Sequence, residues 1–357
     1  MFDPKFAISP SLAQKLIKIE RLASDLQHLE LKPTVLAGLR ETAKIHTIHY
    51  STLIEGNRLT VAEVQTVIND GTHPIGRERD EGEVRGYHLA LNQVLDWVDA
   101  ERTITEGRVQ RLHANVMADG KQANKPSPYR EIQNVVRDAE TGAIIYLPPE
   151  AHDVSMLMAE ICEWLMSEEA LELPAPIVAG LFHYQFVTIH PYIDGNGRTA
   201  RLLTTWLMHR TGYGLGGIYS LEEHYVKNLG AYYAALSLGP SHNYYMGRAE
   251  ADLTPWLEYF IDGVLKSFSA VAKHLESNDL GSKATLISSR NYLDQRKRKI
   301  LELFHPGELI KARDLEEQFN IGSRAVRDLA KKWVEEEFLE IVNSSKKGRL
   351  YRIVSQS

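Results

Sequence analysis

One segment of the sequence, from Pro176 to Ile189, is apolar on most sides of the helix that its spacing predicts. A helix with a single apolar stripe lies at the surface, whereas a helix that is apolar all round must be covered by other elements. The chain of 357 residues, 43% of them hydrophobic, is long enough to provide that cover. We therefore expect this helix at the centre of a helical core.

Helical spacing of apolar residues continues through most of the chain before residue 280. We expect helices at about 9–32, 35–55, 60–70, 82–99, 105–118, 150–167, 176–189, 198–210, 221–237 and 252–276. Glycine, proline, asparagine or aspartate residues bound these segments, as they commonly bound helices. The predicted fold class is therefore mainly α.

One short segment, 134–147, departs from the helical pattern. Its two ends, Asn134–Arg137 and Ala143–Leu147, are β-prone and flank the turn-rich residues 138–142, which predicts a β-hairpin. Two strands alone are marginal in water, so the hairpin must lie against the core or against a ligand. A hairpin that only decorates the surface is the alternative.

The pattern changes again near the C-terminus. We expect helices at 293–304, 312–319 and 323–336 and strands at 338–343 and 349–354. Two short helices joined by a glycine turn, followed by a hairpin with a basic tip, are typical of a winged helix-turn-helix domain. Residues 283–357 carry a net charge of +5 and the preceding residues −11, which favours separate modules. We predict an N-terminal helical region at 1–75, a core at 76–280 and a winged helix-turn-helix domain at 285–357.

The predicted winged helix carries basic side chains that could contact the phosphates of DNA. They are Arg324, Arg327, Lys331 and Lys332 on its last helix and Lys346, Lys347 and Arg349 on the wing. Three glutamates, at 335–337, follow on the same helix, and many winged helices bind protein instead. The sequence leaves both kinds of partner open.

Composition argues against several classes of protein. With 25% charged residues, the chain has an ordinary globular composition, not that of a disordered or fibrous protein. No window approaches the ~20 apolar residues that cross a bilayer, and the first residues lack the pattern of a secretory signal. The single cysteine, Cys162, permits no internal disulfide. We expect a cytoplasmic protein; a homodimer is suggested by base rates alone.

The most informative segment is His190–Arg201, with the sequence HPYIDGNGRTAR. The buried helix should end at His190, because the residue before a proline avoids the α region. Arg198 should begin the next helix. The loop between them, Gly195-Asn196-Gly197, offers free backbone amides at a helix N-terminus, an arrangement that binds phosphate groups.

Side chains of the same segment add to this phosphate site. Arg198 and Arg201 are three positions apart on one side of the first helical turn, so both can reach the same polyphosphate. Asp194 is placed to hold a Mg²⁺ ion shared with those phosphates. His190, whose ordinary pKa is near 6.5, can take the proton from an incoming hydroxyl. Each feature alone is more often structural, but their combination within one short segment favours chemistry.

This segment resembles the motif of the Fic family, His-x-Phe-x-Asp/Glu-Gly-Asn-Gly-Arg-x-x-Arg. The matching residues are His190, Asp194, Gly195, Asn196, Gly197, Arg198 and Arg201. The sequence departs from the motif at Tyr192, where the family usually has Phe; the ring is kept, but a buried hydroxyl would need a partner. The helical core, the hairpin and the C-terminal winged helix also resemble bacterial Fic proteins.

The resemblance implies an enzyme that transfers AMP from ATP to a Tyr, Thr or Ser hydroxyl of a target protein, or of itself, and releases pyrophosphate. His190 would be the base, and Asp194 would hold Mg²⁺ on the α- and β-phosphates. The remaining phosphate contacts would come from Gly195, Asn196, Gly197, Arg198 and, at the γ-phosphate, Arg201. The hairpin 134–147 would be a flap that binds the target by strand addition.

A second candidate, Glu55, lies at the end of the helix predicted at 35–55. A glutamate there faces the negative end of the helix dipole at a cost of about 0.3–1 kcal/mol, which a cationic partner offsets. On spacing alone, a solvated carboxylate is the simpler interpretation. Residues 51–57, STLIEGN, also resemble the family's inhibitory pattern Ser/Thr-x-x-x-Glu-Gly/Asn. The resemblance implies that Glu55 pairs with Arg201, displaces the γ-phosphate and inhibits the enzyme.

Two tyrosines, Tyr232 and Tyr233, resemble by their position the nucleoside-contacting tyrosines of the family. Alternatives to AMP transfer stay open at this point. Glu55 could align a water that removes AMP from the same target, and relatives transfer other phosphate-linked groups such as phosphocholine or UMP. A nucleotide-sensing, DNA-binding regulator is the alternative from a different class of protein.

Overall fold

The computed structural model describes residues 2–28, 31, 33–69, 76–137, 141–279, 300, 309–319, 321–335, 338–343 and 349–353. The chain divides into two compact units, the first with residues 1–28 and 43–272 and the second with residues 29–42 and 273–357. Helix α2 (Pro33–Ile54) therefore has its N-terminal part in the second unit and its C-terminal part in the first. The domain boundary predicted at 280–285 lies outside the described residues.

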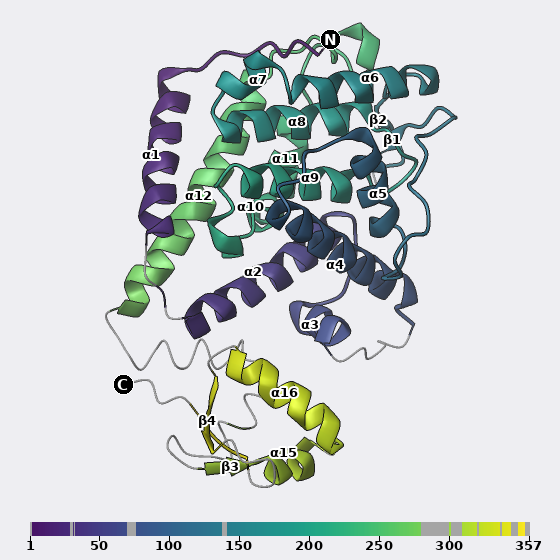
Figure 1. Cartoon of the computed structure of the whole chain (residues 1–357). Helices are drawn as coiled ribbons and strands as arrows, with labels where there is room; N and C mark the ends of the chain where they lie inside the picture. Colours follow the sequence, from purple (N-terminus) through teal and green to yellow (C-terminus); the bar gives the residue numbers. More distant parts are fainter. Residues whose placement is uncertain are drawn as a thin grey trace. The chain divides into compact units, whose positions relative to one another are not determined.

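The first unit is helical (Figure 1). Besides the end of α2, its helices are α1 (Pro10–Gln27), α3 (Val61–Asn69), α4 (Glu78–Asp99), α5 (Glu106–Val116), α6 (Ala151–Trp164), α7 (Glu168–Glu172), α8 (Ala175–Ile189), α9 (Asn196–Arg210), α10 (Glu222–Lys227), α11 (Leu229–Leu236) and most of α12 (Thr254–Asp279). Two 3-10 turns, η1 (Leu215–Gly217) and η2 (Tyr244–Met246), complete it. The predicted mainly α fold is confirmed. In the described part of the chain, no helix is long and apolar enough to cross a membrane.

Helix α8 forms the centre of this unit, as its apolar sequence predicts. Twelve of its fifteen residues are buried, and it packs against α6 and α9 (Figure 1). Gly180 lets α12 approach closely, because a Cβ atom there would lie 2.9 Å from the ring of Phe260. The indole N–H of Trp256 on α12 donates to the Gly180 carbonyl at 2.7 Å. Helix α9 in turn packs against α4 and α5, so the loop between α8 and α9 is held from several sides.

The predicted hairpin is present but short. Strand β1 (Val136–Arg137) pairs antiparallel with β2 (Ile144–Tyr146), and residues 138–140 at its tip lie outside the described residues. The hydroxyl of Tyr146 donates to the carbonyl of Thr188 on α8 at 2.6 Å. Just beyond β2, the backbone N–H of Leu147 donates to the backbone carbonyl of His242 at 2.8 Å. The base of the hairpin therefore lies against the helical core.

The helix predicted at 221–237 is interrupted. Asn228 has a non-helical backbone, with φ −149° and ψ 77°, and separates α10 from α11. Its side-chain oxygen accepts a hydrogen bond from the N–H of Ala231, which caps α11. Asparagine competes for backbone hydrogen bonds in this way, so the apolar spacing alone could not reveal the break.

The second unit has its own core and a three-stranded sheet. It contains β3 (Leu309–Lys311), α15 (Ala312–Phe319), α16 (Ser323–Glu335), β4 (Leu339–Asn343) and β5 (Leu350–Ile353), with strand order β3-β5-β4 and both pairs antiparallel. The core is built on Trp333, which packs edge-on against Phe319 and Phe338. Strand β3 was not predicted.

Several predictions for the C-terminal part stay untested. The wing tip with Lys346 and Lys347 and the helix predicted at 293–304, apart from Ile300, lie outside the described residues. Arg324, Arg327, Lys331 and Lys332 lie exposed on α16. The winged helix-turn-helix assignment and DNA binding therefore remain predictions.

Candidate functional site

The predicted site begins where α8 ends, at His190. Its backbone is left-handed, with φ 52° and ψ 59°, and its N–H donates to the carbonyl of Phe186 at 3.0 Å. Left-handed geometry is uncommon for a residue with a side chain. The sequence predicted that His190 leaves the α region. The structure shows that it adopts the left-handed region, which turns the chain tightly into the next loop.

The ring of His190 is oriented by its own helix. Nδ1 lies 3.2 Å from the carbonyl oxygen of Val187, which assigns the ring proton to Nδ1 and leaves the lone pair on Nε2. Burial lowers the pKa of His190 to about 4, although Glu55 and Asp194 oppose that shift. The imidazole is therefore neutral near pH 7 and can accept a proton at Nε2.

The loop after His190 is locked by the side chain of Asn196. Its Oδ1 accepts from the Tyr192 N–H at 2.9 Å, and its Nδ2 donates to the Tyr192 carbonyl at 2.8 Å. Gly195, with φ 76°, is the N-cap of α9, which begins at Asn196, two residues before the predicted start. The first intrahelical donor is Thr199, whose N–H reaches the Gly195 carbonyl. The amides of residues 196–198 therefore have no acceptor within the helix, which is the condition for an anion site.

The two charged residues that flank the loop face each other. Arg198, only 2% exposed, brings Nη2 to 3.4 Å from Oδ2 of Asp194. The side chain of Asp194 is 59% exposed, so the carboxylate stays accessible to a cation. Its backbone carbonyl is 2.9 Å from Nε2 of His113 on α5. The carboxylate also accepts from the N–H of Gly195 at 2.6 Å, so Asp194 is held at its backbone and oriented at its partly exposed side chain.

Arg201 lies one turn further along α9 and is fully enclosed. Its Nε donates to Ser51 Oγ at 2.7 Å, and its Nη2 donates to the Ser51 carbonyl and to Glu55 Oε1, both at 2.8 Å. Burial alone would lower the pKa of Arg201, but the Glu55 carboxylate together with Tyr232 and Tyr87 raises it. The structure therefore brings Glu55 and Arg201 together as an ion pair, across 146 positions of sequence.

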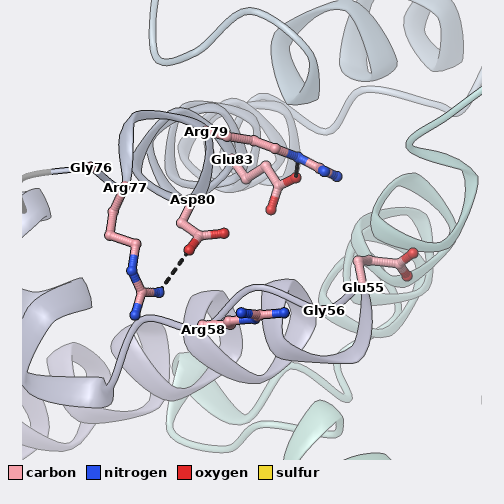
Figure 2. Close-up of a pocket in the computed structure, with 8 residues that line it drawn as sticks. All are labelled: Glu55, Gly56, Arg58, Gly76, Arg77, Arg79, Asp80 and Glu83. Atoms are coloured by element: carbon pink, nitrogen blue, oxygen red, sulfur yellow. Dashed lines mark hydrogen bonds and ion pairs between the residues drawn. The ribbon is translucent and has the colours of Figure 1, made fainter. Parts of the chain in front are cut away.

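The carboxylate of Glu55 also covers the loop. A Cβ atom on Gly197 would lie 2.3 Å from Glu55 Oε1, so the carboxylate sits directly against this glycine. On its other side, Glu55 borders a cavity of about 410 Å³ that is lined further by Gly56, Arg58, Gly76, Arg77, Arg79, Asp80 and Glu83. Figure 2 shows the Glu55 carboxylate pointing away from these lining side chains. Two ion pairs form between side chains that line this cavity: Arg77 with Asp80, and Arg79 with Glu83.

Residues 103–208 match the model of the Fic/DOC family. This part of the chain is similar to a Fic domain. This matched range contains α5, the hairpin, α8 and the His190–Arg201 segment, whereas Glu55, Tyr232 and Tyr233 lie outside it.

Two curated relatives are both called protein adenylyltransferase Fic. The protein of Drosophila grimshawi is 30% identical over 201 residues, which are 56% of this chain and 40% of the relative. That of Drosophila erecta is 31% identical over 225 residues, 58% of this chain and 44% of the relative. The chain thus matches less than half the length of these relatives.

Solved structures show the same fold. A Fic family protein from Desulfovibrio desulfuricans G20 superposes with a TM-score of 0.63 at 23% identity, over 100% of this chain and 99% of that one. Fic-1, residues 134–508, from C. elegans gives a TM-score of 0.60 at 23% identity, over 74% and 73% of the two chains. The Fic-type helical architecture predicted from the sequence is confirmed.

The two predicted nucleoside-contacting tyrosines differ in exposure. Tyr232 is 2% exposed, its ring stacks on Tyr225 with centroids 4.5 Å apart, and its hydroxyl is 3.0 Å from Nε2 of His183. Tyr233 is 45% exposed and its hydroxyl donates to the carbonyl of Ile54 at 3.3 Å. Tyr233 therefore has an exposed ring beside Ile54, the residue before Glu55, whereas Tyr232 contacts the aromatic core of the first unit.

Two residues that no sequence pattern indicated, His113 and Arg130, hold the His190–Arg201 segment in place. His113 stacks on Tyr192 with centroids 3.5 Å apart and an interplanar angle of 10°. Arg130 donates from Nε to the carbonyl of His190 at 3.0 Å. Both precede the motif by 60 residues or more and carry no local signal of their role. The ring of Tyr192 is buried as expected, but within the described residues its hydroxyl has no hydrogen-bond partner.

Proposed function

We propose that this chain transfers AMP from ATP to the hydroxyl of a Tyr, Thr or Ser side chain of a protein. The observation that carries the proposal is the neutral, oriented His190 beside a loop of free amides and two buried arginines. The relatives named protein adenylyltransferase support it. In the reaction, the hydroxyl oxygen bonds to the α-phosphorus of ATP, the bond to the bridging oxygen breaks, and pyrophosphate leaves. His190 Nε2 takes the hydroxyl proton.

The phosphate contacts follow from the same loop. The N–H groups of Asn196 and Gly197 and the guanidinium of Arg198 would hold phosphate oxygens, and Arg201 would hold the γ-phosphate. The N–H of Gly195 donates to Asp194 Oδ1 at 2.6 Å, so it would hold phosphate only once that bond is released. Fixed donors of this kind stabilise the charge that develops on the phosphate oxygens, and such stabilisation usually contributes more to phosphoryl-type catalysis than any other effect. The two guanidinium groups are positioned before ATP binds, so the arginine side chains themselves need little reorganisation.

Asp194 would hold Mg²⁺ on the α- and β-phosphates. Its exposed carboxylate supplies the hard oxygen ligand that Mg²⁺ prefers, and a single carboxylate with phosphates and waters is a common way to bind this ion. In the described residues, no group of three or more metal-ligating side chains exists, so the ion would depend on the nucleotide. When bound, it would neutralise charge on the phosphates.

Glu55 would act as an inhibitor within the chain. Its bond to Arg201 occupies the guanidinium that the γ-phosphate needs, and its carboxylate lies against Gly197 in the phosphate loop. A bound triphosphate would have to displace this carboxylate or bind in another pose. The target protein would dock on the flap 134–147, where Ile144 and Ile145 expose apolar side chains.

The test compares the wild type, Glu55→Gly, Glu55→Gly/His190→Ala and the control Glu78→Gln, which changes an exposed glutamate at the start of α4. Each protein is incubated with Mg²⁺ and ATP labelled on the α-phosphate, alone and with cell lysate. We expect protein-bound label with Glu55→Gly, little with the wild type and Glu78→Gln, and none with the double variant.

Other outcomes point to other functions. Equal or weaker labelling by Glu55→Gly than by the wild type would refute inhibition by Glu55. Absence of label from every variant, in a protein shown to bind ATP, would refute AMP transfer and favour removal of AMP or nucleotide sensing. Retention on DNA that falls with salt concentration would then favour a DNA-binding regulator.

A further inference from the structure

Arg130 lies in the loop between α5 and β1 and is almost completely buried, with 5% of its surface exposed. Its guanidinium donates to three backbone carbonyls: those of His190 at 3.0 Å, Ile132 at 3.2 Å, and Pro149. Its own backbone N–H donates to the carbonyl of Pro191 at 2.9 Å. A single residue thus uses both its main chain and its side chain to hold the end of α8.

The acceptors of Arg130 are all neutral. Within the described residues it forms no ion pair, and burial lowers the pKa of its guanidinium. A buried charge without a counter-ion is costly unless hydrogen bonds replace its hydration. Only the planar fork of arginine can reach three carbonyls in different directions at once; lysine offers a compact ammonium instead. The geometry therefore depends on arginine itself.

The three carbonyls belong to parts of the chain with different roles. Ile132 leads into the hairpin, Pro149 leads out of it, and His190 carries the proposed base. The carbonyl of His190 is the one that its left-handed backbone turns away from α8. Such a conformation costs of order 1 kcal/mol for a residue with a side chain and persists only where its surroundings enforce it.

We propose that Arg130 is a positioning residue that fixes the distance between the flap and His190. The proposal rests on the proposed function, because the flap would present the target hydroxyl and His190 would take its proton. The hydroxyl must come within hydrogen-bond reach of Nε2 for transfer to occur. The chain on both sides of the hairpin and the backbone of His190 all accept hydrogen bonds from the guanidinium of Arg130. The target hydroxyl on the flap and the base His190 would therefore be positioned by the same side chain.

This role separates binding of ATP from transfer of AMP. Arg130 touches none of residues 194–201, which would hold the phosphates. Loss of the guanidinium should therefore leave ATP affinity nearly unchanged while the base moves relative to the flap. A displacement of about 1 Å in such a pair costs about 100-fold in rate.

The activity test uses the Glu55→Gly background, with ATP labelled on the α-phosphate and the chain itself plus lysate proteins as acceptors. Arg130→Ala should lower the maximal labelling rate about 100-fold with an unchanged half-saturating ATP concentration. Guanidinium chloride well below its unfolding range should restore the rate, and Arg130→Lys should restore it in part. Arg111→Ala is the matched control, because Arg111 also donates to a backbone carbonyl, that of Ala123, but does not contact His190.

A rate within a few-fold of the parent, or a parallel loss of ATP affinity, would overturn the positioning role. A rate that guanidinium fails to restore, in a protein that is still folded, would overturn it as well.

A second measurement needs no AMP transfer. The ring C–H signal of His190 in the NMR spectrum, assigned by its loss in His190→Ala, should shift in Arg130→Ala and return with guanidinium. An unshifted signal would overturn the proposal. A shifted signal in a protein that never labels any acceptor would support the anchoring by Arg130 and refute the proposed function, so the two failures are distinguishable.

Discussion

The ion pair between Glu55 and Arg201 makes a quantitative prediction about nucleotide binding. If Glu55 and the γ-phosphate compete for the same guanidinium, Glu55→Gln should strengthen binding of ATP but not of ADP, which lacks that phosphate. The substitution keeps the shape of the side chain and removes its charge. It therefore tests the charge separately from the space that the side chain fills.

The magnitude follows from the contacts. Glu55 contributes one of the three hydrogen bonds of Arg201, at 2.8 Å, and its side chain is 29% exposed whereas that of Arg201 is 1% exposed. A hydrogen bond between charged groups contributes about 1.5–3 kcal/mol. Because about 1.4 kcal/mol corresponds to a tenfold change in affinity, ATP binding should tighten about 10- to 100-fold. Partial exposure places the effect toward the lower end of that range.

Isothermal titration calorimetry with ATP and with ADP, both with Mg²⁺, measures the difference directly for the wild type, Glu55→Gln and the control Glu78→Gln. We expect a tighter ATP complex for Glu55→Gln alone, with ADP affinity equal in all three proteins. Thermal unfolding without nucleotide should also occur at a lower temperature for Glu55→Gln, since Arg201 loses a charged partner in a buried place. Equal tightening of ATP and ADP would refute competition at the γ-phosphate, and so would unchanged ATP affinity.

Three further predictions concern stability. Tyr192→Phe should raise the free energy of unfolding by about 1 kcal/mol, because it removes a buried hydroxyl without a partner among the described residues; destabilisation in urea would contradict this. Gly86→Ala should destabilise strongly, since its Cβ would lie 2.3 Å from the Val116 carbonyl, whereas Gly107→Ala, with nothing within 4 Å, should not; equal unfolding midpoints would contradict this. Burial lowers the pKa of His183 to about 3, so the unfolded chain binds more protons below pH 6.5. The stability that neutral, buried His183 contributes is complete above pH 6.5 and is lost as the pH falls toward 3. The loss is about 1.4 kcal/mol per pH unit once the imidazole of the unfolded chain is protonated. Denaturation midpoints that stay constant between pH 6.5 and 5 would contradict this.

The fold was predictable where the signal is local. Helix α8 carries apolar side chains on most of its sides, which predicted its central position, because a helix without a polar face has no stable position at the surface. The phosphate loop was predictable for a related reason, since its donors and charges lie within one contiguous segment. The break at Asn228 was not, because an asparagine side chain can end a helix without any change in apolar spacing. Strand β3 has only three residues, too few for a pattern.

The parts of the site that depend on distant residues could not be derived from spacing. The partner of Glu55 was expected from family resemblance, and helix-dipole reasoning indicated only that Glu55 needed some cation. Arg130 and His113 carry no such hint, since a single arginine or histidine in a loop or helix is common. What selects them is the backbone they contact, and a backbone carbonyl has the same chemistry in every residue. Sequence reasoning therefore finds side chains that form motifs more readily than those that hold motifs in place.

The manner in which Arg201 is held explains how one carboxylate could act as a reversible inhibitor. Two of its three bonds go to Ser51, through the hydroxyl and the carbonyl, and neither depends on Glu55. A phosphate that replaced Glu55 would therefore meet a guanidinium already aimed at it, and the buried charge would never lack a partner during the exchange. Glu55 follows directly after α2, which ends at Ile54, and the helix dipole disfavours a negative charge there, so its departure also relieves an unfavourable interaction. Ser51 would thus keep the site formed while Glu55 controls access to it, and Ser51→Ala should weaken ATP binding even where Glu55→Gln strengthens it.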